Sequence, residues 1–392
     1  MAISDSLRTI GTLARLASRG AFRAVLDNSG SPKPDGERFD AAFASFLADS
    51  AVMPHIRSAR LHRLQADESG WATTGIEVEP GDQVTIIATG TLWASKLFDM
   101  RFGARIGVWL RAGDEGTIFK TPGDVATLRV DQGGPLCLVA KPPGEWADEQ
   151  GHFDPEYPRS GISGALHICI IVWKADAIEG LTALLQVGDY QNLVSRALDE
   201  ALNPVPTPEG WRYLWRLGQG AIYRDAAQGI ERHIHCHTNE DVGILQFPAD
   251  FPLSDMTRLK WRWKVDKLPS ELPEDIQLTH DYLSIAVEFD NGQDLTYMWS
   301  GRLAEGAIFK CPLAYWDKVE THWVLRSNPA DLGKWLSEER PVKADYARAI
   351  GAPPQRIVRV WLIAVSVFQR GEGICDYADI ELVDGERTLK IL

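Results

Sequence analysis

The run Leu259-Lys-Trp-Arg-Trp-Lys-Val265 alternates apolar and basic residues at every position. Successive side chains of a β-strand point to opposite faces of its sheet, so this run places its apolar side chains on one face and its cations on the other. An amphipathic helix would instead repeat its apolar residues every three or four positions. The run therefore predicts a strand with one buried face, in a sheet that packs against a second apolar layer.

Runs rich in β-branched and aromatic residues, separated by turn formers, continue on both sides of this strand. One short helix interrupts them, beginning near Pro341 and ending at Gly351. Many short strands separated by turns are typical of an antiparallel sandwich. We expect its strands at 230–247, 258–265, 281–289, 294–300, 322–326, 357–368 and 377–383.

The N-terminal half shows a similar strand pattern between Ala51 and Trp173, followed by apolar residues at helical spacing and then by three prolines in six residues. The chain is therefore predicted to be mainly β. It is expected to have two antiparallel, jelly-roll-like β-sandwich domains, a helical connector between them and an N-terminal helical extension. The expected boundaries are 1–50 for the extension, 51–174 for the first sandwich, 175–208 for the connector and 209–392 for the second sandwich.

Charge and cysteine content narrow the function classes. The 41 Lys and Arg residues against 54 Asp and Glu give a formal charge of −13, which repels phosphate backbones, so nucleic acid is not an expected partner. The five cysteines are scattered and form no CxxC pair. This usage fits reduced thiols in the cytoplasm, where we expect the protein to be located. The placement of Cys137, Cys169 and Cys236 within strands indicates small buried apolar groups.

The first 22 residues carry Arg8, Arg15 and Arg19. A secretory signal needs an uninterrupted apolar stretch, so we expect no export signal here. Leu13 and Leu16 belong to an apolar series at helical spacing, which predicts an amphipathic helix. We expect this helix to dock on the protein's own body or on a second subunit of a homo-oligomer. The alternative is attachment to a membrane surface through this helix. A spanning segment is not expected, because it would need about 20 consecutive apolar residues and no run in the sequence is that long.

The run Arg232-His-Ile-His-Cys-His237 concentrates titratable groups in the second half. On a strand, His233, His235 and His237 share one face, opposite Ile234 and Cys236. Imidazoles titrate near neutral pH, so such a row is suited to proton transfer or to metal binding. The row is the candidate site of this sequence.

Two neighbouring strands extend this polar face if all three belong to one sheet. Residues opposite the apolar faces of the 258–265 and 281–289 strands would then join the imidazoles. His235 or His237 is expected to act as general base or acid, oriented by a carboxylate. We expect the catalytic residues to be His235, His237, Glu288, Asp281 and Tyr282. The residues expected to bind substrate are Lys260, Arg262, Trp299 and His233.

Two other interpretations of this face stay open. Sandwiches often expose one polar face of each sheet to water, without any ligand. A zinc or iron variant would use two of the row's imidazoles together with Asp281, His280 or Glu288, because three ligands on one flat strand strain the geometry. Our main expectation is that the protein uses no metal or cofactor. His322, near the strand that contains Trp323, is expected to be a packed or surface histidine.

The segment from Trp71 to Gly90, with its Pro80-Gly-Asp82 turn and its Ala-Thr-Gly ending, resembles the opening of small bacterial galactose-binding lectins, which are calcium-dependent jelly-roll sandwiches. The resemblance covers about residues 60–173. In that family a late Asp and an Asn-rich loop ligate the calcium that holds the sugar. Because 161–173 contains neither Asn nor Asp, the resemblance implies the sandwich fold and not the calcium or galactose site.

The C-terminal half resembles the bacterial domain-of-unknown-function family numbered 3047 over about residues 209–385. The resemblance lies in the 259–265 run, in His280-Asp-Tyr282 and Tyr297-Met-Trp299, and in Gly333-Lys-Trp335 with the later Asp345-Tyr346. That family usually has paired aspartates where this chain has His280-Asp281. The resemblance therefore implies a sandwich and little chemistry.

The residues favour an intracellular enzyme of lyase or hydrolase type that acts on a sugar-derived or similar polar small molecule. The chemistry would be His-based acid/base catalysis in the C-terminal sandwich, with the first sandwich as an accessory or interface domain. The alternative is a non-catalytic glycan-binding or assembly protein. No glycine-rich phosphate loop and no GxSxG elbow is present.

Overall fold

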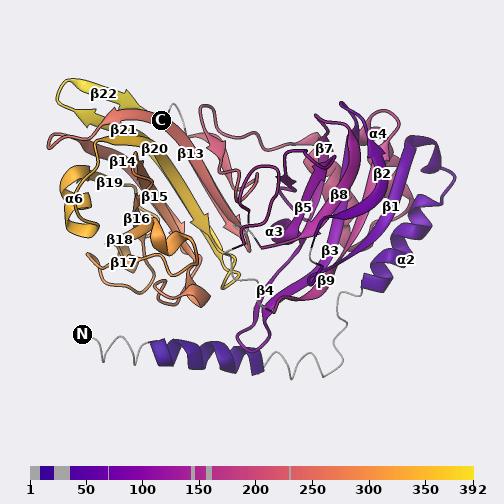
Figure 1. Cartoon of the computed structure of the whole chain (residues 1–392), viewed down its shortest axis with the longest axis horizontal. Helices are drawn as coiled ribbons and strands as arrows, with labels where there is room; N and C mark the ends of the chain where they lie inside the picture. Colours follow the sequence, from indigo (N-terminus) through magenta and orange to yellow (C-terminus); the bar gives the residue numbers. More distant parts are fainter. Residues whose placement is uncertain (1–8, 22–35, 69, 143–145, 156–160, 229–230) are drawn as a thin grey trace. The chain divides into compact units, whose positions relative to one another are not determined.

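The computed structural model describes residues 9–21, 36–68, 70–142, 146–155, 161–228 and 231–392. The chain divides into two units (Figure 1). Unit 1 contains Met1–Thr12, Pro206–Leu214 and Ala221–Leu392, and unit 2 contains Leu13–Val205 and Trp215–Gly220. Both are built mainly of antiparallel strands, so the mainly β class is confirmed.

Unit 2 contains two sheets that enclose an apolar core. The first has the order β1 (Ile56–Gln65), β9 (Ser163–Trp173), β3 (Gln83–Ser95) and β4 (Met100–Phe102), with β7 (Val125–Arg129) beside β3. The second has the order β2 (Ala72–Val78), β8 (Gly134–Ala140), β5 (Val108–Ala112) and β6 (Phe119–Lys120). A short helix, α3 (Ala104–Gly107), precedes β5.

Strand β9 of unit 2 is covered on both faces. Ile168 and Ile170 lie in the core between the two sheets, whereas Ile171 and Trp173, on the other face, pack under helices. These helices are α2 (Gly36–Leu47), α4 (Ala177–Val187) and α5 (Leu193–Leu202). The segment expected to be a connector thus contributes α4 and α5 to the body of unit 2, and the first sandwich has a helical layer on one side.

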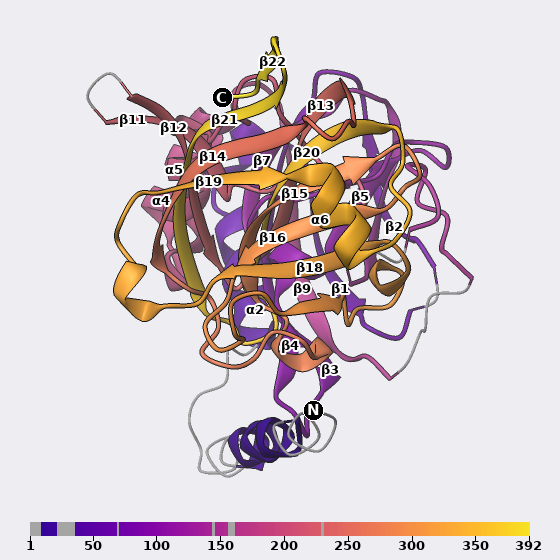
Figure 2. The same ribbon diagram turned by 90° about the vertical axis from the view of Figure 1, so that its left-hand side faces the viewer.

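Unit 1 is a sandwich of two sheets (Figure 2). The seven-stranded sheet has the order β10 (Arg212–Tyr213), β13 (Val242–Pro252), β20 (Arg356–Val365), β15 (Tyr282–Phe289), β16 (Asp294–Trp299), β18 (Glu320–Arg326) and β17 (Ile308–Lys310). The six-stranded sheet has the order β11 (Tyr223–Gln228), β12 (Glu231–Asn239), β21 (Glu372–Asp384), β14 (Arg258–Lys267) and β19 (Leu336–Pro341), with β22 (Arg387–Lys390) beside β21. Strands β16 and β18 are parallel.

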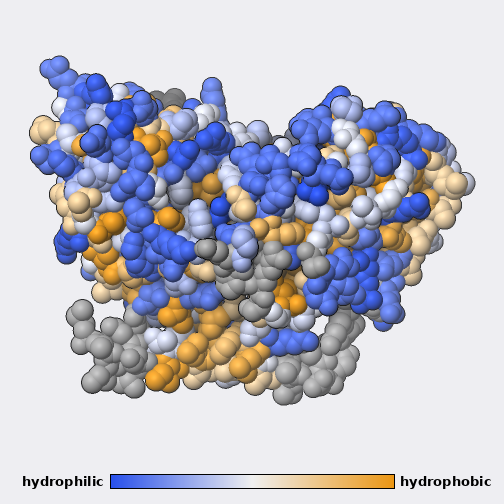
Figure 3. Space-filling view, viewed as in Figure 1, coloured by the Kyte–Doolittle hydropathy of each residue, from blue (hydrophilic) through white to orange (hydrophobic). Residues whose placement is uncertain are grey.

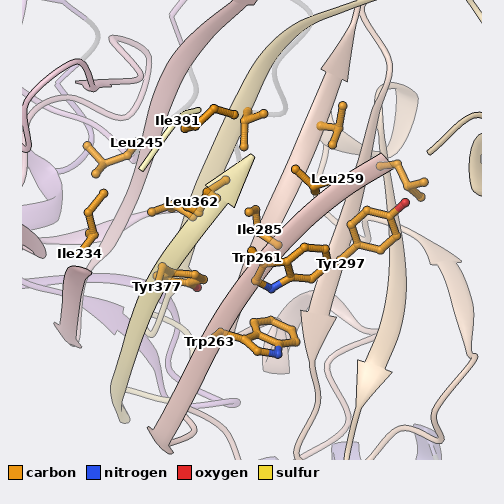
Figure 4. Packing of buried hydrophobic residues seen from close by; sticks show 14 of the residues in the cluster. Ile234, Leu245, Leu259, Trp261, Trp263, Ile285, Tyr297, Leu362, Tyr377 and Ile391 are labelled. Carbon is orange, nitrogen blue, oxygen red and sulfur yellow. The ribbon is translucent and has the colours of Figure 1, made fainter. Parts of the chain in front are cut away.

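The core of unit 1 lies between these sheets and is rich in aromatic rings (Figure 4). The predicted alternation of the 259–265 run is confirmed, because Leu259, Trp261, Trp263 and Val265 are all at most 1% exposed. Trp261 stacks on Tyr297 at 5.7 Å between ring centroids. Full burial of one such side chain contributes about 1.5–3 kcal/mol to folding, so β14 is a principal anchor of the sandwich.

The remaining helices are short, apart from one at the N-terminus. Helix α6 (Val342–Ala349) follows β19, close to the predicted position. The 3₁₀ helices are η1 (Met53–His55), η2 (Tyr190–Asn192), η3 (Gln277–Thr279), η4 (Trp316–Lys318) and η5 (Pro329–Asp331).

The N-terminal helix extends over residues 9–21 in the structure; residues 1–8 and 22–35 of the predicted extension lie outside the described residues. Leu16 is buried and Ile10 is 62% exposed, and apolar side chains gather along this helix in Figure 3. Among the described residues, no helix is both long enough and apolar enough to cross a membrane.

Candidate functional site

The three imidazoles of β12 share one face of the six-stranded sheet, as the alternation predicted. Ile234 and Cys236 point into the core and are fully buried. On the outer face, the side chains of His233, His235 and His237 are 12%, 22% and 48% exposed. The row therefore runs from a largely covered ring to an open one.

His235 is held by a buried carboxylate. It pairs with Asp376 across β12 and β21, and Asp376 pairs with Lys264 across β21 and β14. His235 Nδ1 lies 2.7 Å from Asp376 Oδ1, and Lys264 Nζ lies 2.9 Å from Asp376 Oδ2. Burial alone would raise the pKa of Asp376, but the hydrogen bonds from His235 and Lys264 outweigh it and bring the pKa below its usual range.

His237 forms a second, more exposed unit of the same kind. Its Nε2 lies 2.8 Å from Glu372 Oε1, and Lys267 Nζ lies 2.7 Å from Glu372 Oε2. The hydrogen bond from Lys267 is the largest cause of a lowered pKa at Glu372. The outer face thus carries two His–carboxylate–Lys units, of which only the one at Asp376 has its carboxylate covered.

An aromatic ring, Trp335, lies over the same face. The guanidinium carbon of Arg262 is 5.1 Å from the centroid of its ring, and Lys264 Nζ is 5.9 Å away. His233 meets the ring edge-on at 6.2 Å. Cations over an indole face are attracted by its quadrupole, so this half-buried ring is fixed in place beside the row.

The cations predicted to bind substrate already face carboxylates. Arg262 Nε is 2.8 Å from Asp379 Oδ2. Lys260 Nζ lies 3.9 Å from carboxylate oxygens of both Glu339 and Glu381. Cations and carboxylates therefore alternate on the outer face, and the face is not a positive patch.

The condition that all three strands belong to one sheet is met by β12 and β14 but not by β15. Strand β15 lies in the seven-stranded sheet, with the core between it and the imidazole row. Tyr282 and Glu288 are consequently on the opposite side of the sandwich. Glu288 is occupied there by Arg359 Nη1 at 2.7 Å and by the indole N–H of Trp361 at 3.1 Å.

Two further candidates have structural partners away from the row. Asp281 is fully buried, and its two oxygens accept the backbone N–H groups of Phe368 and Gln369. Burial raises the pKa of Asp281 to about 7. Trp299 lies in the core against Trp263, at 5.3 Å between ring centroids. Neither side chain shares a face with His235.

A cluster that strand alternation does not predict lies at the β17–β18 side of the seven-stranded sheet. Its ligand-type atoms all lie within 4.8 Å of one another, and its members are at most 3% exposed. Burial, and next the neighbouring His322, lower the pKa of His280 to about 3. The members are His280, Cys311, Glu320 and His322.

One local signal for this cluster was present in the sequence. Glu320 and His322 stand two apart on one strand and therefore share a face. His280 and Cys311, by contrast, lie outside strands, and periodicity does not indicate where such residues meet. Tyr282, predicted as catalytic, does contact the cluster, because its hydroxyl donates to Glu320 Oε1 at 3.0 Å.

Comparisons with known proteins agree with the C-terminal resemblance. A family model described as a protein of unknown function, DUF3047, matches residues 214–381, which is less than half of the chain. The comparison with curated proteins finds no match.

The solved structures that resemble this chain do so at low identity and low TM-score. The N-terminal domain of EclA, a PllA-like lectin, is 15% identical and covers 29% of this chain and 94% of its own, with a TM-score of 0.22. The xyloglucanase domain of NopAA from Sinorhizobium fredii, in complex with cellobiose, is 7% identical and covers 46% and 94%, with a TM-score of 0.29. Endoglucanase 3 of Trichoderma harzianum is 7% identical and covers 41% and 83%, with a TM-score of 0.26. At these values the similarities assign no ligand or reaction to this chain.

Proposed function

We propose that unit 1 binds a neutral sugar or a similar polar small molecule on the outer face of its six-stranded sheet, and that His235 acts there as a general base. The reaction class is hydrolysis or elimination. The observation that carries the proposal is the continuous chain Lys264–Asp376–His235, with contacts of 2.9 and 2.7 Å.

The chemistry follows from the tautomer of His235 that the hydrogen bond to Asp376 selects. Asp376 accepts hydrogen bonds only, so it holds the proton of His235 on Nδ1 and leaves Nε2 as the basic nitrogen. No protein group hydrogen-bonds Nε2 of His235 within the described ranges. A base with one nitrogen oriented and the other available can take a proton from water or from a substrate carbon.

The ligand class follows from the charges of the face. Because Lys260, Arg262 and Lys264 each face a carboxylate, an acidic ligand would have to displace an existing ion pair. A neutral polyhydroxylated ligand instead exchanges hydrogen bonds with both signs of charge. Trp335 supplies an aromatic surface beside them, of the kind that packs against the apolar face of a sugar ring.

The alternative is a non-catalytic glycan-binding or assembly protein. Its specific support is the fixed ring of Trp335, because recognition by stacking needs no proton transfer. In this alternative, Trp335 contributes most of the affinity and His235 little.

Turnover and binding separate these two functions. We would incubate the full chain with nitrophenyl glycosides and neutral oligosaccharides and follow the release of nitrophenol or reducing ends. H235A is expected to abolish turnover, whereas H237A is the matched control, since it removes the imidazole of the exposed unit. Equal losses in both variants, or turnover in neither the variants nor the wild type, would contradict catalysis at His235. Binding without turnover that is lost in W335A would establish the alternative.

The proposal also includes the cellular location of the protein and the role of unit 2. All five cysteines are buried and unpaired, which suits a reducing compartment, and we place the protein in the cytoplasm. Unit 2 would serve as an accessory or interface domain. Attachment of the N-terminal helix to a second subunit or to a membrane surface has its own test in the Discussion.

A further inference from the structure

We propose that the buried cluster of unit 1 binds one divalent transition-metal ion of the zinc class, through four protein ligands. The ligands are His280, Cys311, Glu320 and His322. This site lies on the seven-stranded sheet and is independent of the proposed ligand face on the six-stranded sheet. Figure 2 shows β18, which carries Glu320 and His322, beside β16 and β15 of the same sheet.

The strand register brings the ligands together. His322 and Glu320 lie on one face of β18, and Phe309 on β17 pairs with His322. One step beyond the end of β17, the backbone N–H of Cys311 donates to the carbonyl of Glu320 at 3.1 Å. Cys311 therefore lies directly opposite Glu320, and His280 closes the group from the segment before β15.

The spacing of the ligand atoms matches a tetrahedral ion. Zinc bonds of about 2.3 Å to sulfur and about 2.05 Å to nitrogen or oxygen give edges of ~3.6 Å for S···N and ~3.3 Å for N···O. Cys311 Sγ lies 3.4 Å from His280 Nε2. His322 Nε2 lies 3.4 Å from Glu320 Oε1. Two edges of the tetrahedron are thus already present, and the others are at most 4.8 Å.

The groups around the cluster orient the ligands as outer-sphere partners do. The carbonyl of Glu274 lies 2.5 Å from His280 Nδ1, so it accepts that N–H and leaves Nε2 as the metal-binding nitrogen. The hydroxyls of Tyr282 and Thr296 donate to Glu320 Oε1 at 3.0 and 3.2 Å. Phe309 stacks on His322 at 4.9 Å between ring centroids and keeps that ring in place.

Both ring nitrogens of His322 lack the partner that an ion would supply. His322 is 0% exposed, and neither of its ring nitrogens makes a hydrogen bond in the described part of the chain. Glu320 is 3% exposed, and no lysine or arginine among the described residues forms an ion pair with it. Two hydroxyl donors do not neutralise a buried carboxylate, whose negative charge is costly without a cation. A divalent cation would balance the Glu320 carboxylate together with a Cys311 thiolate.

The types of ligand atom indicate which metal binds and whether the site is structural or catalytic. Two imidazoles and one thiolate favour zinc or a similar transition ion over magnesium or calcium, which take oxygen ligands. Four protein ligands at full burial describe a closed, structural site without an open position for substrate. The ion would fasten the segment between β16 and β18, which contains β17, onto the sheet. A Cys311 nucleophile is disfavoured, because its thiol is 1% exposed.

The first test uses the wild-type full chain and needs no substitution. The protein is expressed in medium with zinc, and weakly bound metal is removed by dialysis. The zinc content is then measured by mass spectrometry, and we expect about one equivalent per chain. The stripped protein is then refolded with Co²⁺, which should give the absorption of a tetrahedral ion together with a thiolate-to-cobalt charge-transfer band. Less than 0.1 equivalent of transition metal, or cobalt binding without the thiolate band, would overturn the proposal.

Variants then locate the ion. C311S and H322Q are expected to reduce zinc content at least tenfold and to remove the thiolate band or shift the cobalt spectrum. C375S, a fully buried cysteine of the same unit, and H237Q, on the other sheet, should retain one equivalent. Circular dichroism confirms that each variant is folded. Metal retained in both C311S and H322Q, or lost in H237Q, would place the ion elsewhere and refute this site.

Discussion

Asp376 Oδ1 lies 2.7 Å from His235 Nδ1, while its Oδ2 lies 2.9 Å from Lys264 Nζ, so one carboxylate on the central strand β21 connects residues on both neighbouring strands. Replacing Asp376 with Asn removes the acceptor that sets the tautomer of His235. We expect D376N to lower kcat by about 10²- to 10⁴-fold, the usual contribution of a positioned base. The assay is steady-state kinetics on the substrate found in the glycoside screen. E372Q, which alters only the exposed unit, should lose less than threefold, and an equal loss would argue against a special role for Asp376.

The same carboxylate should affect acid stability. Its folded pKa is depressed, so its stabilising contribution is complete above the unfolded pKa of about 3.9 and is lost as the pH falls through the folded value. The difference in unfolding free energy between wild type and D376N should therefore shrink from pH 6 to pH 3, in urea titrations. D379N, which removes a carboxylate that is 69% exposed, should show no such trend. A constant difference across this range would contradict the linkage.

Two core tryptophans provide a matched pair for stability. Trp263 and Trp299 are both fully buried. The indole N–H of Trp263 donates to Glu338 Oε1 at 3.1 Å, whereas that of Trp299 has no hydrogen-bond partner within the described residues. We expect W263F to cost about 1–2 kcal/mol more than W299F, because it leaves a carboxylate oxygen with one donor fewer. Chemical denaturation measures both, and equal costs would show that packing alone decides.

Removal of metal should weaken unit 1. An ion held at 100 times its Kd adds about 2.7 kcal/mol to the folded state. A strong chelator should therefore lower the thermal midpoint of the wild type by several degrees and leave that of C311S unchanged. Scanning calorimetry with and without chelator gives the result. A chelator effect of the same size in C311S would show that it acts at another site.

The N-terminal helix has two possible partners, which can be separated. If residues 9–21 hold a membrane surface through their exposed apolar side chains, the full chain should float with anionic vesicles and a chain lacking residues 1–25 should sink. If the helix joins two copies, light scattering should instead show that deletion lowers the molar mass. A folded deletion variant with unchanged mass and no flotation difference would mean that the helix docks on its own chain.

Local periodicity predicted much of the architecture and part of the site. The faces of β12 and β14 follow from alternation, which is a property of each strand alone. Sheet membership depends on pairing between distant segments. For this reason alternation alone wrongly groups Glu288 and Tyr282 with imidazoles that lie across the core from them.

The buried cluster shows the same limit more sharply. Glu320 and His322 are close in sequence, but Cys311 reaches them only through the β17–β18 pairing and His280 through a segment without regular structure. His322 was expected to be a packed or surface histidine, and it is packed. That its neighbours are a thiol, a carboxylate and another imidazole depends on long-range pairing, which local periodicity does not predict.

Strand β9 in unit 2 has a consequence for motion. Because it is shared by the core between the sheets and by the layer beneath the helices, its backbone meets water only when both layers separate. Amide hydrogens of residues 166–173 should thus be among the last in unit 2 to exchange with deuterium, at a rate that reports opening of the whole unit.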